Sequence, residues 1–299
     1  MSTSASHPSA VAAVCAVDED AYAADVVVLG TWLASKLELE PRFVHVAPAQ
    51  PRPDAADLHL LNAARAAASA LFEDLRLPSG RTEMVVAESA AAGILGAARE
   101  HGAQLVIMGS RGQGAVTSAA LGSTTRAVIA EREVPVVVVR AGAAPVTLGG
   151  PLVCAVVDDG ADQIALAQAV GRMAARLGAA LVLVHAVELG SVRTGSPRMP
   201  GPRVDTDRGA AERLMRQVLS KLPPGLDVDA RVRPGRPAPV IADVADEVSS
   251  DLVIVGHRAR GAVATAVTGS TALELIGMGT RPTMLLPPRL ADGFLPLRR

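Results

Sequence analysis

Glycines spaced around a predicted helix start are the residues of this chain best suited to bind a ligand. They lie within residues 105–126, which read LVIMGSRGQGAVTSAALGSTTR. An apolar run ends at Gly109, Gly112 follows after two residues, and nine further residues lead to Gly122 and Ser123. This spacing predicts a strand, a glycine loop and the first turn of a helix. Such a loop can present backbone N–H groups and the positive end of a helix to an anion.

The loop is present twice, because residues 252–271 repeat the pattern. Gly256 and Gly269 each lie 147 positions after their counterparts, Gly109 and Gly122. An aspartate and a histidine are also 27 residues apart in both halves, as Asp18 and His45 and as Asp158 and His185. Two independent spacings preserved in both halves indicate a tandem duplication. We therefore predict one domain at residues 9–140 and a second at residues 150–288.

Apolar runs alternate with helix-periodic segments around each copy of the loop. In the first copy the expected strands are residues 11–17, 42–47, 82–87, 104–108 and 135–139. Runs that are apolar throughout indicate strands buried in a parallel sheet. The predicted fold class is α/β, with two tandem, doubly wound, five-stranded parallel-sheet domains of the Rossmann-like type. Ligands bind such sheets at the carboxyl ends of the strands, where Asp18, Val46 and Gly109 would lie.

Composition narrows the possible partners and the compartment. The 299 residues include 29 basic and 30 acidic side chains, a balance that offers no electrostatic attraction for nucleic acid or a membrane surface. Cys15 and Cys154 lie inside apolar runs without metal-ligand spacing, which predicts buried thiols in a reducing compartment. No signal peptide or membrane-spanning pattern is seen, so we expect a cytoplasmic protein. Residues 289–299 are expected to be peripheral.

Together these residues resemble the universal stress protein family, over nearly the whole chain. The resemblance implies the adenine nucleotide alpha hydrolase-like version of the fold, with ATP bound between the first and fourth strands. In copy 1 the implied contacts to adenine and ribose are Ala16, Asp18 and Val46, and those to the phosphates are Gly109, Arg111, Gly112, Gly114, Gly122, Ser123 and Thr124. The counterparts in copy 2 are Val156, Asp158, Ala186, Gly256, Arg258, Gly261, Gly269, Ser270 and Thr271.

Both copies depart from the family pattern. In copy 2, Ala259 replaces the second glycine of the loop, which costs roughly 1 kcal/mol if that position needs a positive φ. In copy 1, Glu19 and Asp20 follow Asp18, where the family often has Gly and Ser. Extra acid repels a triphosphate unless magnesium bridges the phosphate oxygens or the side chains point away. We therefore expect copy 1 to be the intact site and copy 2 to bind weakly or not at all.

Simpler interpretations exist for most of these residues. Asp18 and Asp158 are also suitable helix caps, and Arg111 and Arg258 could be solvated loop arginines. His45 and His185 lie inside apolar strands, which favours core histidines with satisfied hydrogen bonds. A phospho-receiver domain is excluded, because its aspartate and lysine after the third and fifth strands are replaced by Ala87-Glu88-Ser89 and Arg140.

The function expected from the resemblance is that of an ATP-binding, nucleotide-dependent stress-response regulator with an unknown protein partner. The alternative is a nucleotide-free scaffold of the same fold. We expect no catalytic residues, no protein metal site and no efficient turnover, since no general base for attack on a γ-phosphate is evident; slow ATP hydrolysis stays compatible with the sequence. The apolar last strands, residues 136–139 and 283–286, are expected to pair within the chain as a pseudo-dimer, or in a homodimer.

Overall fold

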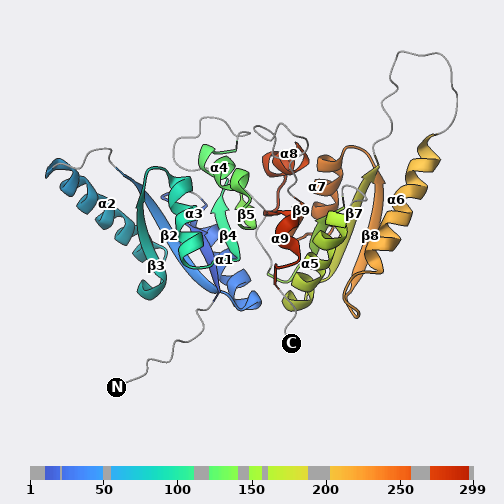
Figure 1. Ribbon diagram of the computed structural model, residues 1–299, viewed down its shortest axis with the longest axis horizontal. Coiled ribbons are helices and arrows are strands. Elements are labelled where there is room, and N and C mark those ends of the chain that lie inside the picture. The colour runs from blue at the N-terminus through green and yellow to red at the C-terminus, as the bar shows by residue number, and fades with distance from the viewer. Residues whose placement is uncertain are drawn as a thin grey trace, which may run out of the picture. The chain divides into compact units, whose positions relative to one another are not determined.

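The computed structural model divides the chain into two compact units, Met1–Ala141 and Gly142–Arg299, called unit 1 and unit 2 below (Figure 1). The structure describes residues 11–20, 22–49, 55–110, 121–140, 148–156, 161–187, 203–256 and 270–295, with no side-chain detail at residues 55–58, 161, 203–207 and 270.

Unit 1 is built on a parallel sheet with the strand order β3-β2-β1-β4-β5. Its strands are β1 (Ala12–Ala16), β2 (Glu40–Pro48), β3 (Thr82–Ala87), β4 (Leu105–Gly109) and β5 (Val136–Val139). Its helices are α1 (Ala23–Leu37), α2 (Ala55–Asp74), α3 (Ala90–Glu100) and α4 (Ser123–Glu131). The order runs outward from β1 in both directions, so the connection from β3 to β4 crosses back over the sheet.

Unit 2 repeats this arrangement with the strand order β8-β7-β6-β9-β10. Its strands are β6 (Leu152–Ala155), β7 (Leu181–Val187), β8 (Val228–Pro234), β9 (Leu252–Gly256) and β10 (Thr283–Leu286). Its helices are α5 (Ala161–Leu177), α6 (Arg203–Leu219), α7 (Pro237–Glu247), α8 (Ser270–Met278) and the short α9 (Pro288–Ala291). Both units therefore confirm the predicted α/β class with doubly wound parallel sheets.

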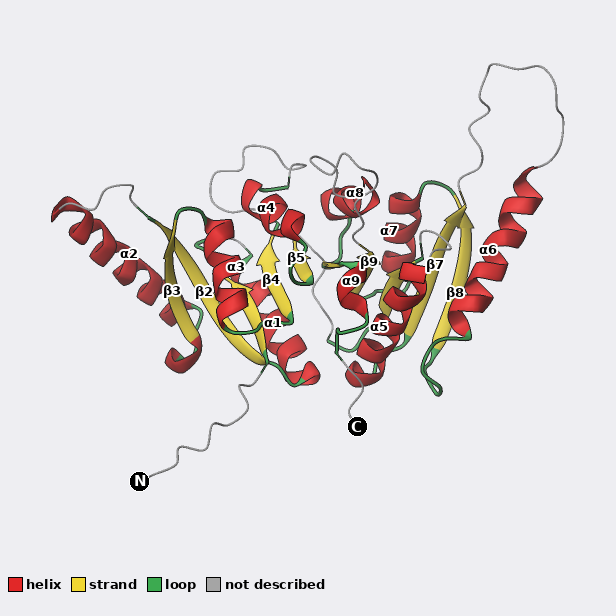
Figure 2. Ribbon diagram, viewed as in Figure 1, coloured by secondary structure: helices red, strands yellow, loops and turns green. Residues whose placement is uncertain are grey.

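The central strands are buried on both faces, as their continuous apolar sequences require. Every residue of β5, β6 and β10 is buried, and helices cover both faces of each sheet (Figure 2). Cys15 and Cys154 are free and fully buried, and burial raises the pKa of both thiols to about 12. The prediction of buried thiols is confirmed, and such thiols are poor nucleophiles. Within the described ranges, no helix is long and apolar enough to cross a membrane.

Two features of unit 2 differ from the expectation. Helix α6 begins at Arg203, although a loop was predicted up to that residue and a helix only from residue 210. The helix continues through Gly209, a residue that argues against helix on propensity alone. The predicted peripheral tail is also wrong in part: Phe294 and Leu295 are buried, and the guanidinium of Arg172 in α5 donates to the carbonyls of Ala291 (2.7 Å) and Phe294 (3.2 Å). The prediction failed because the partner surface on α5 exists only in the folded unit.

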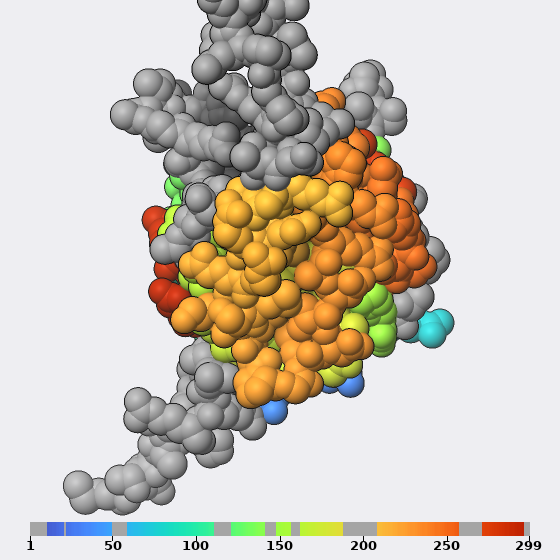
Figure 3. All heavy atoms as spheres, turned by 90° about the vertical axis from the view of Figure 1, so that its right-hand side faces the viewer, coloured from blue at the N-terminus to red at the C-terminus, as the bar shows by residue number. Residues whose placement is uncertain are grey.

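Strand β8 closes the outer edge of the unit 2 sheet with charged side chains, on the face shown in Figure 3 together with α6. Arg231 pairs with Asp229 (2.7 Å) and with Glu247 of α7 (3.0 Å), and Arg233 pairs with the same glutamate (2.9 Å). Exposed pairs of this kind add little stability. Charges on an edge strand instead oppose pairing with another chain.

A buried aspartate binds the backbone just before β6. Asp251, directly before β9, is fully buried, and its Oδ2 accepts the N–H groups of Gly149 (2.7 Å) and Gly150 (2.6 Å). Its own N–H donates to the carbonyl of Pro151 (3.1 Å). The repeat spacing aligns Asp251 with Gln104 of unit 1, whose N–H makes the equivalent bond to Ala12 (2.9 Å). The carboxylate is therefore an addition of unit 2 that holds the entry to β6 against β9.

Replacing this carboxylate should weaken unit 2 specifically. Asp251→Ala removes two charge-assisted hydrogen bonds and is expected to lower the free energy of unfolding by about 2–3 kcal/mol. Calorimetry should show this as a lower-temperature transition for unit 2. Asp243→Ala, which removes an exposed acid from α7 of the same unit, serves as the control and should change little. Equal effects of the two substitutions would contradict the role assigned to Asp251.

Candidate functional site

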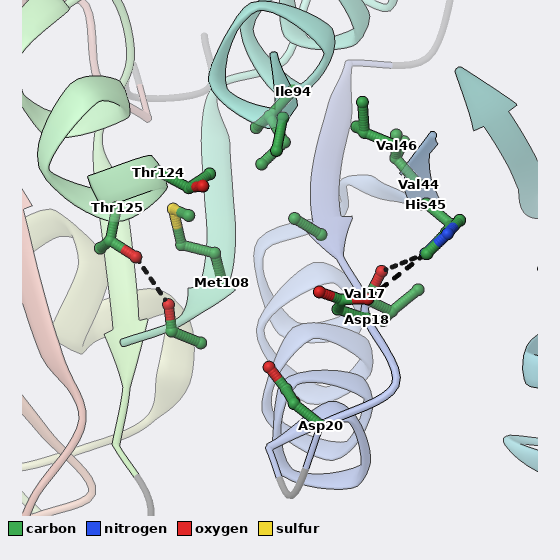
Figure 4. Close-up of a pocket in the computed structure, with 13 residues that line it drawn as sticks. Val17, Asp18, Asp20, Val44, His45, Val46, Ile94, Met108, Thr124 and Thr125 are labelled. Atoms are coloured by element: carbon green, nitrogen blue, oxygen red, sulfur yellow. Dashed lines mark hydrogen bonds and ion pairs between the residues drawn. The ribbon is translucent and has the colours of Figure 1, made fainter. Parts of the chain in front are cut away.

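A pocket opens in unit 1 at the carboxyl ends of β1, β2 and β4 (Figure 4). It lies where the strand order reverses, because β1 pairs with β2 on one side and with β4 on the other. Parallel α/β sheets bind ligands at such a switch point, where the flanking connections run to opposite faces and leave a crevice. The lining residues are Ala16, Val17, Asp18, Asp20, Val44, His45, Val46, Ala90, Ile94, Met108, Gly109, Thr124 and Thr125.

The structure brings five predicted site residues together around this pocket. Ala16 and Asp18 come from the end of β1, Val46 from β2, Gly109 from the end of β4 and Thr124 from the first turn of α4. Sequence segments about ninety residues apart thus meet at one crevice, because parallel pairing aligns the ends of β1 and β4.

Local hydrogen bonds fix the entry of α4 beside the pocket. Gly122 is the N-cap of the helix and its N–H donates to the carbonyl of Ser110 (2.8 Å). Ser123 begins the helix, as predicted, and the hydroxyl of Thr125 donates to the carbonyl of Gly109 (2.9 Å). The positive end of α4 therefore lies against the carboxyl end of β4, and Thr124 lies at the pocket wall.

The other predicted site residues lie outside the described ranges or in unit 2. Those of the two glycine loops and the end of the first unit 2 strand fall outside the described residues: Arg111, Gly112, Gly114, Asp158, Arg258, Gly261 and Gly269. In unit 2, Val156 follows β6, Ala186 lies in β7, Gly256 ends β9, and Ser270 and Thr271 begin α8. These positions lie at strand ends and a helix start as their counterparts do, except that Val156 takes the place of Val17 and not of Ala16.

A histidine fixes the residue after the first strand in each unit. The Nδ1 of His45 lies 3.1 Å from the carbonyl oxygen of Val17, and that of His185 lies 2.6 Å from the carbonyl oxygen of Val156. A carbonyl only accepts, so each Nδ1 carries the proton. The predicted hydrogen bonds are confirmed, but both histidines are half-buried and do not lie in the core. His45 also lines the pocket, which its position in an apolar strand did not suggest.

The acidic run Asp18-Glu19-Asp20 places two of its three carboxylates at the pocket. Glu19 is exposed and does not line it, whereas Asp18 and Asp20 do. Asp18 accepts the N–H of Glu19 (2.9 Å), so it does not cap α1; Asp20 accepts the N–H of Tyr22 (2.8 Å). Burial raises the pKa of Asp20 to about 6, with a further rise from the Asp18 charge, although the Tyr22 N–H opposes it. Together with His45, these are the ionisable side chains among the described lining residues.

The apolar wall of the pocket was missed at the level of sequence. Val44 and Ile94 lie opposite Met108 in Figure 4, and together they form an apolar surface between β2, α3 and β4. Neither Val44 nor Ile94 was among the predicted site residues. Nothing in an apolar sequence pattern distinguishes a residue that faces the core from one at the edge of a crevice.

In unit 2, side chains of α5 lie close to the end of β9. A Cβ placed on Gly256 would lie 3.2 Å from Cδ2 of Leu166 and 3.3 Å from Nε2 of Gln163, both in α5. Gln163 is buried, and the aspartate spacing aligns it with Ala23 of unit 1. A long amide side chain thus occupies unit 2 where unit 1 carries a methyl group. No cluster of residues suited to hold a metal ion is found in the described parts of either unit.

The sequence profile of the universal stress protein family matches residues 12–140 and 151–287, so the chain belongs to this family, with two tandem domains. A universal stress protein from Mycolicibacterium smegmatis is 28% identical over 198 residues, which span 62% of this chain and 63% of that protein. The crystal structure of a candidate universal stress protein from Pseudomonas aeruginosa superposes on this one with a TM-score of 0.64. The alignment covers 96% of each chain, at 15% sequence identity. That likeness confirms the fold.

Some proteins of this family have been solved with adenine nucleotides. One universal stress protein is in complex with cAMP, and one from Archaeoglobus fulgidus is in complex with dAMP. Each matches about half of this chain, with 46% coverage and TM-scores of 0.37 and 0.33. The bound nucleotides belong to those two structures.

The raised pKa of Asp20 predicts a pH dependence of stability. The carboxyl takes up a proton more readily in the folded state (pKa about 6) than in the unfolded chain (about 3.9), so its stabilising contribution is present at low pH and is lost as the pH rises through 6. Asp20→Asn, whose amide oxygen can still accept the Tyr22 N–H, should therefore gain stability relative to wild type between pH 4 and pH 7. Urea unfolding across that range measures the difference, and Glu19→Gln, the exposed neighbour, is the control. A difference that does not vary with pH would contradict the burial of Asp20.

Proposed function

We propose that this chain is an ATP-binding, nucleotide-dependent stress-response regulator, and that the unit 1 pocket is its nucleotide site. The observation that carries the proposal is the position of the pocket at the β1–β4 switch point, with the N-terminus of α4 at its wall. This geometry suits a ligand with an aromatic, largely apolar part and an anionic part. An adenine nucleotide has both.

The two parts of the ligand would meet different walls. Val44, Val46 and Ile94 offer an apolar surface for the base, while Thr124 and the first N–H groups of α4 offer donors and a positive helix end for phosphate. Asp18, at the end of β1 between these walls, is a carboxylate acceptor suited to ribose hydroxyls.

The acidic side chains of the pocket affect how a triphosphate could bind. Asp18 and Asp20 would repel a triphosphate at neutral pH, and Mg²⁺ bound to the phosphate oxygens would offset that repulsion. We therefore expect ATP to bind more tightly with magnesium than without it. Unit 2 is the weaker candidate, since Ala259 replaces a loop glycine and Gln163 fills space beside Gly256.

Efficient hydrolysis is not part of the proposal. A general base must reach the attacking water, but the ionisable side chains of the pocket, Asp18, Asp20 and His45, come from the ends of β1 and β2, whereas the α4 entrance where the phosphates would lie contributes Thr124 and Thr125. Phosphate release from ATP by the wild type should not exceed that by Asp18→Ala. Faster release by the wild type would identify the chain as an enzyme.

The proposal predicts that a negative charge at the helix entrance blocks the nucleotide. Thr124→Asp should weaken binding of ATP with Mg²⁺ by about 30-fold or more, because the new carboxylate faces the phosphates. The fold should be unaffected, since an acid in the first turn of α4 is favourable. Isothermal titration calorimetry measures the affinity, and thermal unfolding measures the stability.

The duplicated chain supplies a matched control. Thr271→Asp makes the same change at the corresponding position of α8 and should leave the affinity of the unit 1 site unchanged. If Thr124→Asp and wild type bind equally, the phosphates do not lie at α4. If wild type binds no ATP and its unfolding temperature does not shift with ATP and Mg²⁺, the nucleotide-free scaffold is the better description.

A further inference from the structure

A glycine inside α3 lies directly against the pocket wall without lining the pocket. A Cβ placed on Gly93 would lie 2.5 and 2.9 Å from the two methyl carbons of Val46, and 3.2 Å from the Cβ of Ala87. Contacts below 3.0 Å are not tolerated, so any side chain at this position would force Val46 or the helix to move. Glycine is unfavourable inside a helix, and a packing constraint of this kind accounts for its presence.

The neighbours of Gly93 are pocket residues. Val46 and Ile94, the residue after Gly93, both line the pocket. Helix α3 packs across β1, β2 and β3, so its distance from β2 determines how far apart these two side chains are. The close approach at Gly93 therefore sets the width of the apolar wall.

The second copy has the opposite arrangement at the same place. The repeat spacings align Gly93 with Val240 of α7, and Val46 with Ala186 of β7. In unit 2 the branched side chain is thus on the helix and the small one is on the strand. Space for Val240 also comes from Gly235, whose φ is +134° and whose Cβ, if present, would lie 2.9 Å from a Val240 methyl carbon. Helix α7 packs against β7 as α3 packs against β2, but the valine of the pair is on the strand in unit 1 and on the helix in unit 2.

We infer that Gly93 is a positioning residue of the unit 1 site, one that holds Val46 in the wall where the base of a nucleotide would pack; this rests on the proposed function. It acts through Val46 and touches no ligand itself. The exchange of Val46 and Gly93 for Ala186 and Val240 gives the two units apolar walls of different shape. The contact of Gly93 with Val46 therefore shapes the apolar wall in unit 1, and unit 2 has no equivalent pair of residues.

A double-mutant cycle tests the inference. Gly93→Ala should weaken binding of ATP with Mg²⁺ about tenfold, because the added methyl displaces Val46. Val46→Ala removes the two methyl carbons that would lie closer than 3.0 Å to the new Cβ, and leaves only the milder contact with the Cβ of Ala87. Adding Gly93→Ala to Val46→Ala should therefore change the affinity by less than about threefold. Calorimetric titration of the four proteins gives the coupling between the two positions.

Gly96 of the same helix is the matched control. A Cβ placed there meets nothing within 4 Å, so Gly96→Ala makes the same chemical change without the contact and should bind as wild type does. Thermal unfolding of each variant separates loss of fold from loss of binding. A Gly93→Ala variant that binds like wild type, or a loss that Val46→Ala does not cancel, would overturn the role of Gly93. A wild type that binds no nucleotide would instead overturn the proposed function, and the site role of Gly93 with it.

Discussion

The parallel pairing of β1 with both β2 and β4 is the constraint on which unit 1 depends. β1 is an apolar strand buried on both faces and both edges, so its neighbours must be supplied by segments far apart in the chain. The chain reaches one neighbour directly and the other only after crossing the sheet. The crevice at the carboxyl ends of β1 and β4 is a consequence of that strand order, and it does not depend on which side chains line it.

Polar bonds at the strand ends turn this crevice into a defined site. His45 holds the carbonyl of Val17, and Thr125 holds the carbonyl of Gly109, so the two rims are fixed by side chains that also line the pocket. Asp20, in contrast to these stabilising bonds, lowers the stability of the fold. Its burial raises its pKa, which means that a charged carboxylate is kept at the pocket at some cost in stability at neutral pH. Sites of function are where such a cost is commonly found.

Duplication has let the two units diverge around the same frame. The histidine bond is kept in unit 2, between His185 and Val156, because it secures the fold whether or not a ligand binds. Side chains around the crevice are less constrained: Gln163 lies beside Gly256, and the sizes at the helix–strand contact are reversed in Ala186 and Val240. Unit 2 also gains a carboxylate at Asp251 and a packed tail through Arg172. The family membership is common to both units, whereas these details differ between them.

The sequence by itself determined the α/β class, the duplication and the strand ends at which the site lies. Those properties follow from local patterns: continuous apolar runs, helix periodicity and glycine spacings read along the chain. It did not determine the apolar wall of Val44 and Ile94, the place of Asp20 in the pocket, or the close contact of Gly93 with Val46. It also missed the burial of Phe294 and Leu295, which depends on a surface of α5 more than a hundred residues away. Only the tertiary structure decided these, because each is a contact between segments whose separate sequences give no sign of their partner.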